Sequence, residues 1–247
     1  MQFAWCVPTA IDRVIQQAVL QRLQPLWDPT FSEHSYGFRP NRSAHQAVAK
    51  AQAYVAEGYR FVVDLAGRRV MTSLTRFIEG RLKLQVNAQK SAVARPWQRS
   101  FLGFTVTDEP QPQRPIADKA VARFKDRVRD LTRRHRGVSL ERMIADLNPL
   151  LRGWAGYFGF SQWRELGSLD GWTRRRLRCV VWVQWKTRGK RYQELRRLKV
   201  SERTASAAIF SPKGPWRLSS SSALHRAFTN ARFRALGLLS MEKLAAA

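Results

Sequence analysis

The carboxylates of this chain are the first residues to consider for chemistry, and they are scattered. Asp64 ends a predicted strand at 59–65, where a carboxylate could bind a metal ion. Two-metal phosphoryl transfer, however, needs several carboxylates that converge on ions about 4 Å apart. The 247 residues contain no Asp-Asp pair and no Asp-x-Asp. The histidines fit neither a metal site nor a catalytic triad by spacing (His34, His45, His135 and His225). We therefore predict no catalytic residue, no metal site and no cofactor.

Phosphate binding is a second chemistry, and a predicted helix at 169–188 concentrates the groups for it. Arg174, Arg175 and Arg178 are spaced i, i+1, i+4 and are expected on one face. Guanidinium groups at this spacing can contact successive phosphates, and each contact adds to a salt-dependent affinity. Some tryptophans of the same segment could stack on bases. A solvated basic face over a tryptophan-rich core is the alternative interpretation. Further candidate phosphate contacts lie in the last turn of this helix, just after it, or in the predicted loop at 211–222 (Lys186, Arg188, Lys190, Arg191 and Arg217).

Two shorter segments could contact a nucleic-acid strand. Residues 35–43 form a predicted tight loop, in which Arg39 could hold a phosphate and Arg42 lies nearby; an ordinary turn is the alternative. A predicted strand at 99–107 places Gly103 between aromatic residues, and glycine there permits another backbone to approach closely. A plain core strand is the alternative for this segment.

The net charge indicates the class of partner. The chain has 44 basic and 18 acidic residues, and the net charge of +26 divides into +8 for residues 1–107 and +18 for residues 108–247. Self-repulsion of this size opposes compaction, and a polyanion would offset it. No apolar run approaches the roughly 20 residues of a membrane span. Nucleic acid is therefore favoured over a membrane surface, and no small-molecule substrate is expected.

The thiols and the first residues indicate a compartment. Cys6 and Cys179 are isolated, which predicts no disulfide framework and suits a reducing environment. Residues 1–7 have no basic segment followed by a long apolar one, so we expect no signal peptide and a cytoplasmic protein.

The predicted elements are mostly helices, so the fold class we expect is α+β with helix dominant. Pro149 should kink or split one helix, and the proline-containing segment 108–115 is the expected main boundary. Strands are predicted at 59–65, 82–86 and 99–107. Helices are predicted at 10–26, 44–57 (capped by Ser43), 68–81, 117–136, 139–158 (capped by Ser139), 169–188, 192–198, 201–209 and 223–236.

Several segments, in this order, resemble the bacterial group II intron-encoded reverse transcriptase/maturases. The resemblance runs from residue 7 to residue 241. Its motifs are Val7-Pro8-Thr9-Ala10-Ile11 in a fingers helix, Ser35-Tyr36-Gly37-Phe38-Arg39-Pro40 in the second polymerase block, Phe101-Leu102-Gly103-Phe104 near the primer grip, Arg152-Gly153-Trp154-Ala155-Gly156-Tyr157 in the thumb, and Leu169–Arg178 with Gly214-Pro215-Trp216-Arg217 in the maturase domain.

The chain also departs from the pattern of this family. The family's first metal-binding aspartate belongs two residues past Asp64, where this chain has Ala66. The Tyr-Ala-Asp-Asp loop that carries the other two is missing, with most of the palm. We also expect the first fingers segment and a zinc-like endonuclease domain to be missing. The resemblance therefore transfers binding roles and no catalytic residue, and Mg²⁺ is expected only for the intact family enzyme.

The resemblance implies four parts and a function. Residues 1–65 would be a remnant of the fingers and first palm strand, 66–107 the end of the palm, 108–165 the thumb and 166–247 the maturase-specific domain. The implied function is to bind structured group II intron RNA and assist splicing, with polymerisation lost and a DNA target as a second polyanion. An active RNA-directed DNA polymerase and a decayed, functionless remnant are the alternatives. Thumb arginines join the expected RNA contacts (Arg127, Arg133 and Arg134).

Overall fold

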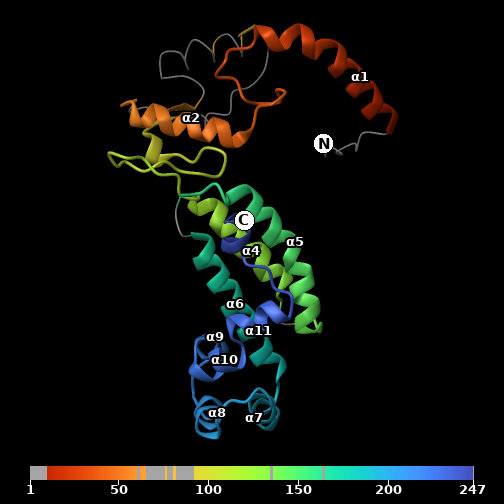
Figure 1. The fold of residues 1–247 in the computed structure, drawn as a ribbon, viewed down its shortest axis with the longest axis vertical. Helices are drawn as coiled ribbons and strands as arrows, with labels where there is room; N and C mark the ends of the chain where they lie inside the picture. The colour runs from red at the N-terminus through yellow and green to blue at the C-terminus, as the bar shows by residue number, and fades with distance from the viewer. Residues whose placement is uncertain are drawn as a thin grey trace. The chain divides into compact units, whose positions relative to one another are not determined.

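The computed structural model describes residues 10–59, 62–64, 76, 80–81, 92–133, 136–162 and 165–246. The chain divides into two compact units, Met1–Ala53 and Tyr54–Ala247. Helices dominate (Figure 1). The described residues form one sheet of two short strands. The helix-dominated fold expected from the sequence is confirmed. No helix in the described ranges is long and apolar enough to cross a membrane.

The first unit contains α1 (Ala10–Trp27), the 3₁₀ turn η1 (Asp28–Thr30) and most of α2 (Ala44–Ala56). Both predicted helices are confirmed, although Pro25, expected to end the first, lies inside it. Ser43 caps α2 as predicted. Its hydroxyl accepts a hydrogen bond from the Gln46 amide at 3.3 Å, and the Gln46 side chain accepts one from the Ser43 amide at 2.8 Å. This reciprocal pair satisfies two amide groups at the helix start.

The second unit contains the end of α2 and then a small antiparallel sheet. β1 (Val62–Asp64) pairs with β2 (Ala92–Ala94), with Val63 opposite Val93. The strand predicted at 59–65 is confirmed over residues 62–64. The helix predicted at 68–81 and the strand at 82–86 fall almost entirely outside the described residues, and so does Ala66. The 3₁₀ turn η2 (Pro96–Gln98) follows the sheet.

The strand predicted at 99–107 is wrong, because the chain reverses at its centre. Phe101 and Phe104 exchange both backbone hydrogen bonds, at 2.8 and 3.0 Å, across a two-residue turn. Leu102 and Gly103 have φ of 51° and 83°, as hairpin turns with both central residues in the left-handed region require. A Cβ on Gly103 would lie 3.2 Å from the Phe158 ring. This glycine therefore serves the turn and a close aromatic contact.

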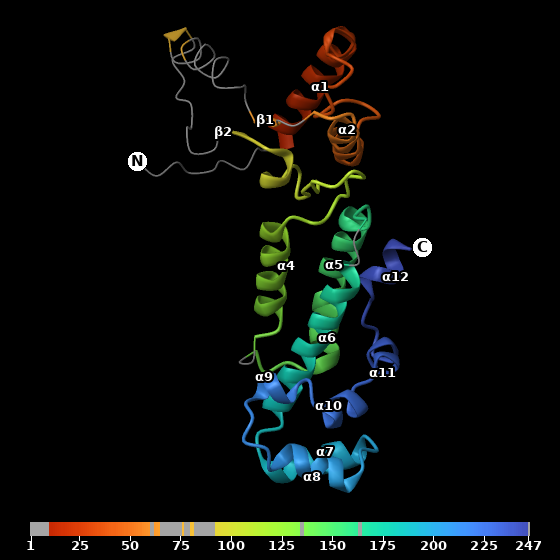
Figure 2. The same cartoon turned by 90° about the vertical axis from the view of Figure 1, so that its left-hand side faces the viewer.

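Three long helices form the core of the second unit: α4 (Asp118–Leu131), α5 (Leu140–Phe158) and α6 (Glu165–Gln184). In Figure 2, α5 lies beside α4 and α6, against which it packs. Ser139 caps α5 by accepting from the Arg142 amide at 3.2 Å, as predicted. Pro149 does not split the helix, which continues through it. The fully buried side chains between these helices include Phe124, Met143, Leu147, Leu151 and Leu177.

Short helices complete the second unit: α7 (Arg188–Arg197), α8 (Glu202–Ile209), α9 (Pro215–Leu218), α10 (Ser222–Ala227), α11 (Asn230–Ala235) and α12 (Met241–Ala245). The single helix predicted at 223–236 is wrong: it is α10 and α11, because Thr229 interrupts the run and caps α11 through the Arg232 amide. The loop predicted at 211–222 contains α9. Helix α12 was not predicted. Its start is held by buried Asp170, which accepts from the Ser240 hydroxyl at 2.7 Å and the Met241 amide at 3.1 Å.

The four parts expected from the resemblance remain predictions. The boundaries at 65/66, 107/108 and 165/166 are different from the division of the chain into two units after Ala53, which reflects compactness alone.

Candidate nucleic-acid interface

The arginine run of α6 spreads around the helix, because successive residues turn by about 100°. Arg174 is partly exposed. Arg175 reaches α9, where its Nη2 donates to the Trp216 carbonyl at 3.2 Å. Arg176 reaches the end of α4, where its Nε donates to the Thr132 hydroxyl at 3.1 Å. Of these three neighbouring arginines, Arg175 and Arg176 therefore connect α6 to other helices, whereas Arg174 is partly exposed.

Arg178 lies inside the protein and not on the phosphate-binding face that its spacing predicts. The residue is 4% exposed. Its Nε and Nη2 both donate to the Phe228 carbonyl, at 3.1 and 3.0 Å, and its guanidinium lies 5.5 Å from the Phe233 ring centre. Burial, with a smaller contribution from Arg174, lowers the pKa of Arg178 to about 10. Arg178 thus anchors the segment between α10 and α11 to α6 through the Phe228 carbonyl.

A tryptophan–arginine cluster joins α4, α6 and α9; we define it as Lys125, Arg129, Trp172, Arg175 and Trp216. The Arg175 guanidinium lies 4.2 Å from the Trp216 ring centre. Lys125 and Arg129 lie 5.9 and 5.6 Å from the Trp172 ring centre. The two tryptophan rings are 6.5 Å apart at 58°. Cations at these distances are attracted by the negative faces of the rings.

The segment from Lys186 to Arg191 carries a second group of cations. Lys186, Arg188 and Lys190 are exposed, whereas Arg191 is half-buried and its Nε donates to the Trp182 carbonyl at 3.3 Å. Thr187 caps α7 by accepting from the Lys190 amide. Lys190 also pairs with buried Glu194 at 2.8 Å, and its hydrogen bond is the main cause of the lowered pKa of that carboxyl. The cap fixes the start of α7, so the exposed cations project from a defined turn.

The remaining predicted contacts of the second unit lie on α4 and α9 or follow α4. Arg127 and Arg217 are exposed. Arg133 is exposed and pairs with Asp130 at 2.7 Å, an interaction of the kind that contributes little when solvated. Arg134 lies outside the described residues. Three of these four arginines are thus placed at the surface.

Arg39 stabilises its own loop through hydrogen bonds to neighbouring residues. Its Nε donates to the Asp28 carboxylate at 2.8 Å, its Nη1 to the Ser32 carbonyl at 2.8 Å and its Nη2 to the Asp28 carbonyl at 3.0 Å. The Arg39 hydrogen bond is the largest cause of the lowered pKa of Asp28. Arg42 is exposed, 5.3 Å from the Tyr36 ring centre. The predicted tight loop is therefore present, but the structure uses Arg39 to fold it.

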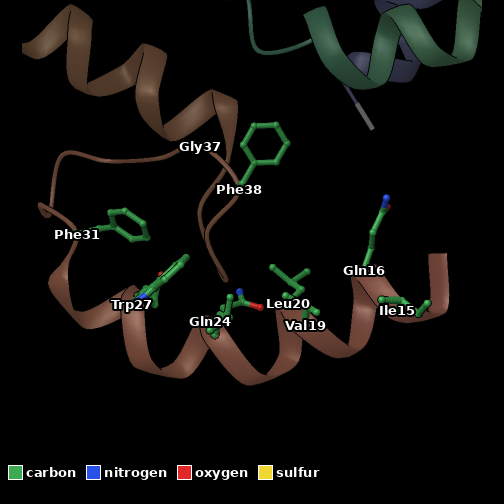
Figure 3. A pocket seen from close by; sticks show the side chains of 11 residues that line it. Ile15, Gln16, Val19, Leu20, Gln24, Trp27, Phe31, Gly37 and Phe38 are labelled. Atoms are coloured by element: carbon green, nitrogen blue, oxygen red, sulfur yellow. The ribbon is translucent and has the colours of Figure 1, made fainter. Parts of the chain in front are cut away.

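The concave surface of the first unit is apolar. A cavity of about 570 Å³ lies along α1 and is lined on the other side by Phe31, Gly37 and Phe38 (Figure 3). The α1 side chains that face it include Ile15, Val19 and Leu20. Its described lining contains one charged residue, Asp28, which is negative. This lining does not suit phosphate, so the candidate interface is in the second unit.

Most of the tryptophan–arginine cluster was not predicted from the sequence. Core packing was the alternative for the tryptophans of α6, and neither Lys125 nor Arg129 was named as a contact. One feature of the sequence does predict that these two cations lie together: they are four residues apart, which places them on one face of α4. Their convergence on Trp172 depends on the packing of α4 against the rest of the core, which the sequence does not specify. Among the described residues, no group of three or more His, Cys, Asp or Glu could hold a metal ion.

Comparison with known proteins relates these residues to a family. Residues 121–199 match the family described as "Group II intron, maturase-specific domain". The chain is 45% identical over 42 residues to the group II intron-encoded protein LtrA of Lactococcus lactis, covering 17% of this chain and 7% of LtrA. It is 33% identical over 94 residues to nuclear intron maturase 2, mitochondrial, of Arabidopsis thaliana, covering 34% of this chain and 12% of that protein. A match to protein YkfC of Escherichia coli covers 17% of this chain and 11% of that protein at 45% identity.

Residues 121–199 therefore relate this chain to the group II intron maturases, as the sequence motifs predicted. The matched segments correspond to only 7–12% of the length of these relatives. The family match covers most of α4 and all of α5, α6 and α7. It therefore contains both the arginine run of α6 and the cations at the start of α7.

Proposed function

We propose that this protein binds structured group II intron RNA and assists its splicing. The observation that carries the proposal is the maturase-specific match over residues 121–199, which contains the most basic helices of the chain. Positive side chains that project from fixed helices suit a folded RNA, because they can contact phosphates at set distances. The name of LtrA connects that relative with a group II intron.

The proposed RNA contacts are mainly the exposed and partly exposed cations of the second unit. They are Arg127, Arg133, Arg174, Lys186, Arg188, Lys190 and Arg217, with Arg134 kept as a sequence-based candidate and Arg42 proposed for the first unit. Arg175, Arg178 and Arg191 support this surface by donating to backbone carbonyls. Arg39 supports its own loop. This division separates residues whose removal weakens RNA binding from residues whose removal weakens the fold.

A triple variant tests the proposed set of contacts. Replacing Lys186, Arg188 and Arg217 by Ala should weaken binding of intron RNA and flatten the dependence of affinity on salt by about one unit of slope for each phosphate that is no longer contacted. The matched control replaces the exposed residues Lys119, Arg152 and Lys243, which removes the same charge elsewhere in the second unit. Equal flattening in both variants would show that net charge, and not this surface, binds the RNA.

The proposal includes the loss of polymerisation, and residues 1–107 are proposed to derive from the fingers and palm of an ancestral enzyme. The support comes from the sequence, which contains no Asp-Asp or Asp-x-Asp and has Ala66 in place of the family's first metal-binding aspartate. Primer extension on an RNA template with Mg²⁺ should give no product. A template-dependent product from the purified protein would overturn this part of the proposal.

A further inference from the structure

The tryptophan–arginine cluster combines features that phosphate binding alone does not need. Trp216 is 36% exposed although it is a large aromatic residue, and Trp172 is partly exposed beside it. Three cations from two helices approach the two rings, and Arg129 also pairs with Asp126 on its own helix. Exposed rings among cations are typical of surfaces on which nucleic-acid bases stack, because every base has a π-face and every nucleotide a phosphate.

The backbone of Trp216 is anchored by hydrogen bonds, and its ring is in contact with Arg175. Arg175 covers Trp216 from α6 and donates to the Trp216 carbonyl at 3.2 Å and to the Ser219 hydroxyl at 3.4 Å. The Ser219 hydroxyl in turn donates to the Trp216 carbonyl at 2.6 Å, and Ser219 is fully buried. Pro215 fixes the first residue of α9, which packs against α6 (Figure 2). A ring that is already fixed loses little conformational entropy when a ligand stacks on it.

The geometry of the two rings determines how a base could bind. At 58° and 6.5 Å the rings are not parallel, so a base cannot be sandwiched between them. The exposed surface of Trp216 remains for stacking. Lys125 and Arg129 lie at the neighbouring Trp172, and Arg217 is exposed next to Trp216 along the chain. These cations suit the phosphates on either side of a stacked nucleotide.

We propose that Trp216, supported by Arg175 and flanked by Trp172, binds one unpaired nucleotide of an RNA by stacking on its base. The inference rests on the proposed RNA-binding function and adds to it a site for an unpaired base. A paired base inside a helix does not offer its face, so the site favours loops and bulges. Because stacking does not depend on base identity, the site requires an unpaired base and selects little among the four.

The experiment uses the full chain and two RNA hairpins that differ only in the loop. One loop carries adenines, and in the other abasic riboses replace them, so the phosphates are unchanged. The wild-type protein should bind the adenine loop more tightly by about fivefold to about 150-fold. Trp216→Ala should remove this preference and bind both hairpins as the wild type binds the abasic one, whereas Trp216→Phe should retain most of it.

Phe210→Ala is the matched control. Phe210 is 73% exposed and its ring centre lies 5.9 Å from the Arg188 guanidinium, so it is an exposed aromatic residue with a cation outside the cluster. Its replacement should leave the loop preference unchanged. If the wild type binds both hairpins equally well, or if Trp216→Ala keeps the preference, the stacking site is refuted while RNA binding stands. If the wild type binds neither these hairpins nor intron RNA, the proposed function fails as well.

Discussion

At the scale of single residues, arginines that are neighbours in the sequence have different roles. Arg174 is partly exposed, Arg175 stacks on Trp216, and Arg178 is buried with two hydrogen bonds to one carbonyl. The i, i+4 spacing of Arg174 and Arg178 predicts a shared face, but it does not predict that the chain between α10 and α11 covers one end of that face. Burial is therefore what separates a phosphate contact from a structural support.

Replacing Arg178 by Met should destabilise the fold. The change keeps an unbranched apolar side chain in the buried space but removes both donors to the Phe228 carbonyl. Hydrogen bonds from a charged group typically contribute about 1.5–3 kcal/mol, and we expect the free energy of unfolding in urea to fall by about that amount. Arg174→Met on the same helix is the control and should change it by less than about 0.5 kcal/mol. Equal effects would contradict the structural role of Arg178.

Glu165 gives a prediction about pH. Burial, with a smaller contribution from Asp118, raises the pKa of its carboxyl, while hydrogen bonds from the Ile116 amide, at 2.7 Å, and the Ser161 hydroxyl oppose the rise. A raised pKa means that the folded protein holds this proton more tightly than the unfolded chain does. The contribution of Glu165 to stability is therefore greatest below its unfolded pKa and is lost as the pH rises through the folded pKa.

Glu165→Gln removes this titration and keeps an oxygen that accepts from the Ile116 amide. The free energy of unfolding of the wild type, minus that of the variant, should decrease as the pH rises from about 4 to about 7. Thermal or urea unfolding at several pH values measures this difference. A difference that increases over this range would mean that the pKa of Glu165 is lowered by the fold.

At the scale of elements, local signals predicted the long helices well. The caps at Ser43 and Ser139 and the apolar periodicity placed α1, α2 and α5 within a few residues. The predictions of secondary structure failed where tertiary contacts or the conformation of a turn determine the local structure. Phe101–Phe104 has strand composition, yet Leu102 and Gly103 adopt positive φ and reverse the chain. Buried Asp170 in α6 holds α12 from 71 positions away, a contact that no local pattern reveals.

The hairpin turn at Gly103 provides a test at this scale. Gly103→Ala places a Cβ in the left-handed region, which costs about 1–2 kcal/mol, and 3.2 Å from the Phe158 ring. We expect the free energy of unfolding to fall by at least that amount. Gly156→Ala is the matched control, because Gly156 lies inside α5 with no neighbour within 4 Å of the new Cβ. This second change should stabilise the fold by about 0.5–1 kcal/mol. A neutral Gly103→Ala would contradict the assigned turn.

At the scale of the whole molecule, the charge and the family match support the same proposal. The net charge of +26 is concentrated in the part of the chain that contains the maturase-specific match. The charge alone predicted a polyanionic partner, and the motifs predicted which one. Neither could predict the tryptophan–arginine cluster, because its members come from three helices that meet only in the folded protein. A folded basic surface and a merely basic polypeptide differ in one respect: only the former distinguishes one folded RNA from another.

The most direct measurement is a salt-series titration with two RNAs of equal length, a group II intron and an unrelated structured RNA. Phosphate contacts alone give equal affinities that fall steeply with salt. We predict tighter binding of the intron that persists at physiological salt, because the fixed positions of the surface cations and of Trp216 add interactions that depend on RNA shape. Equal affinities for both RNAs that fall steeply with salt would contradict the proposed function, because they would show that the binding depends only on the net charge of the chain.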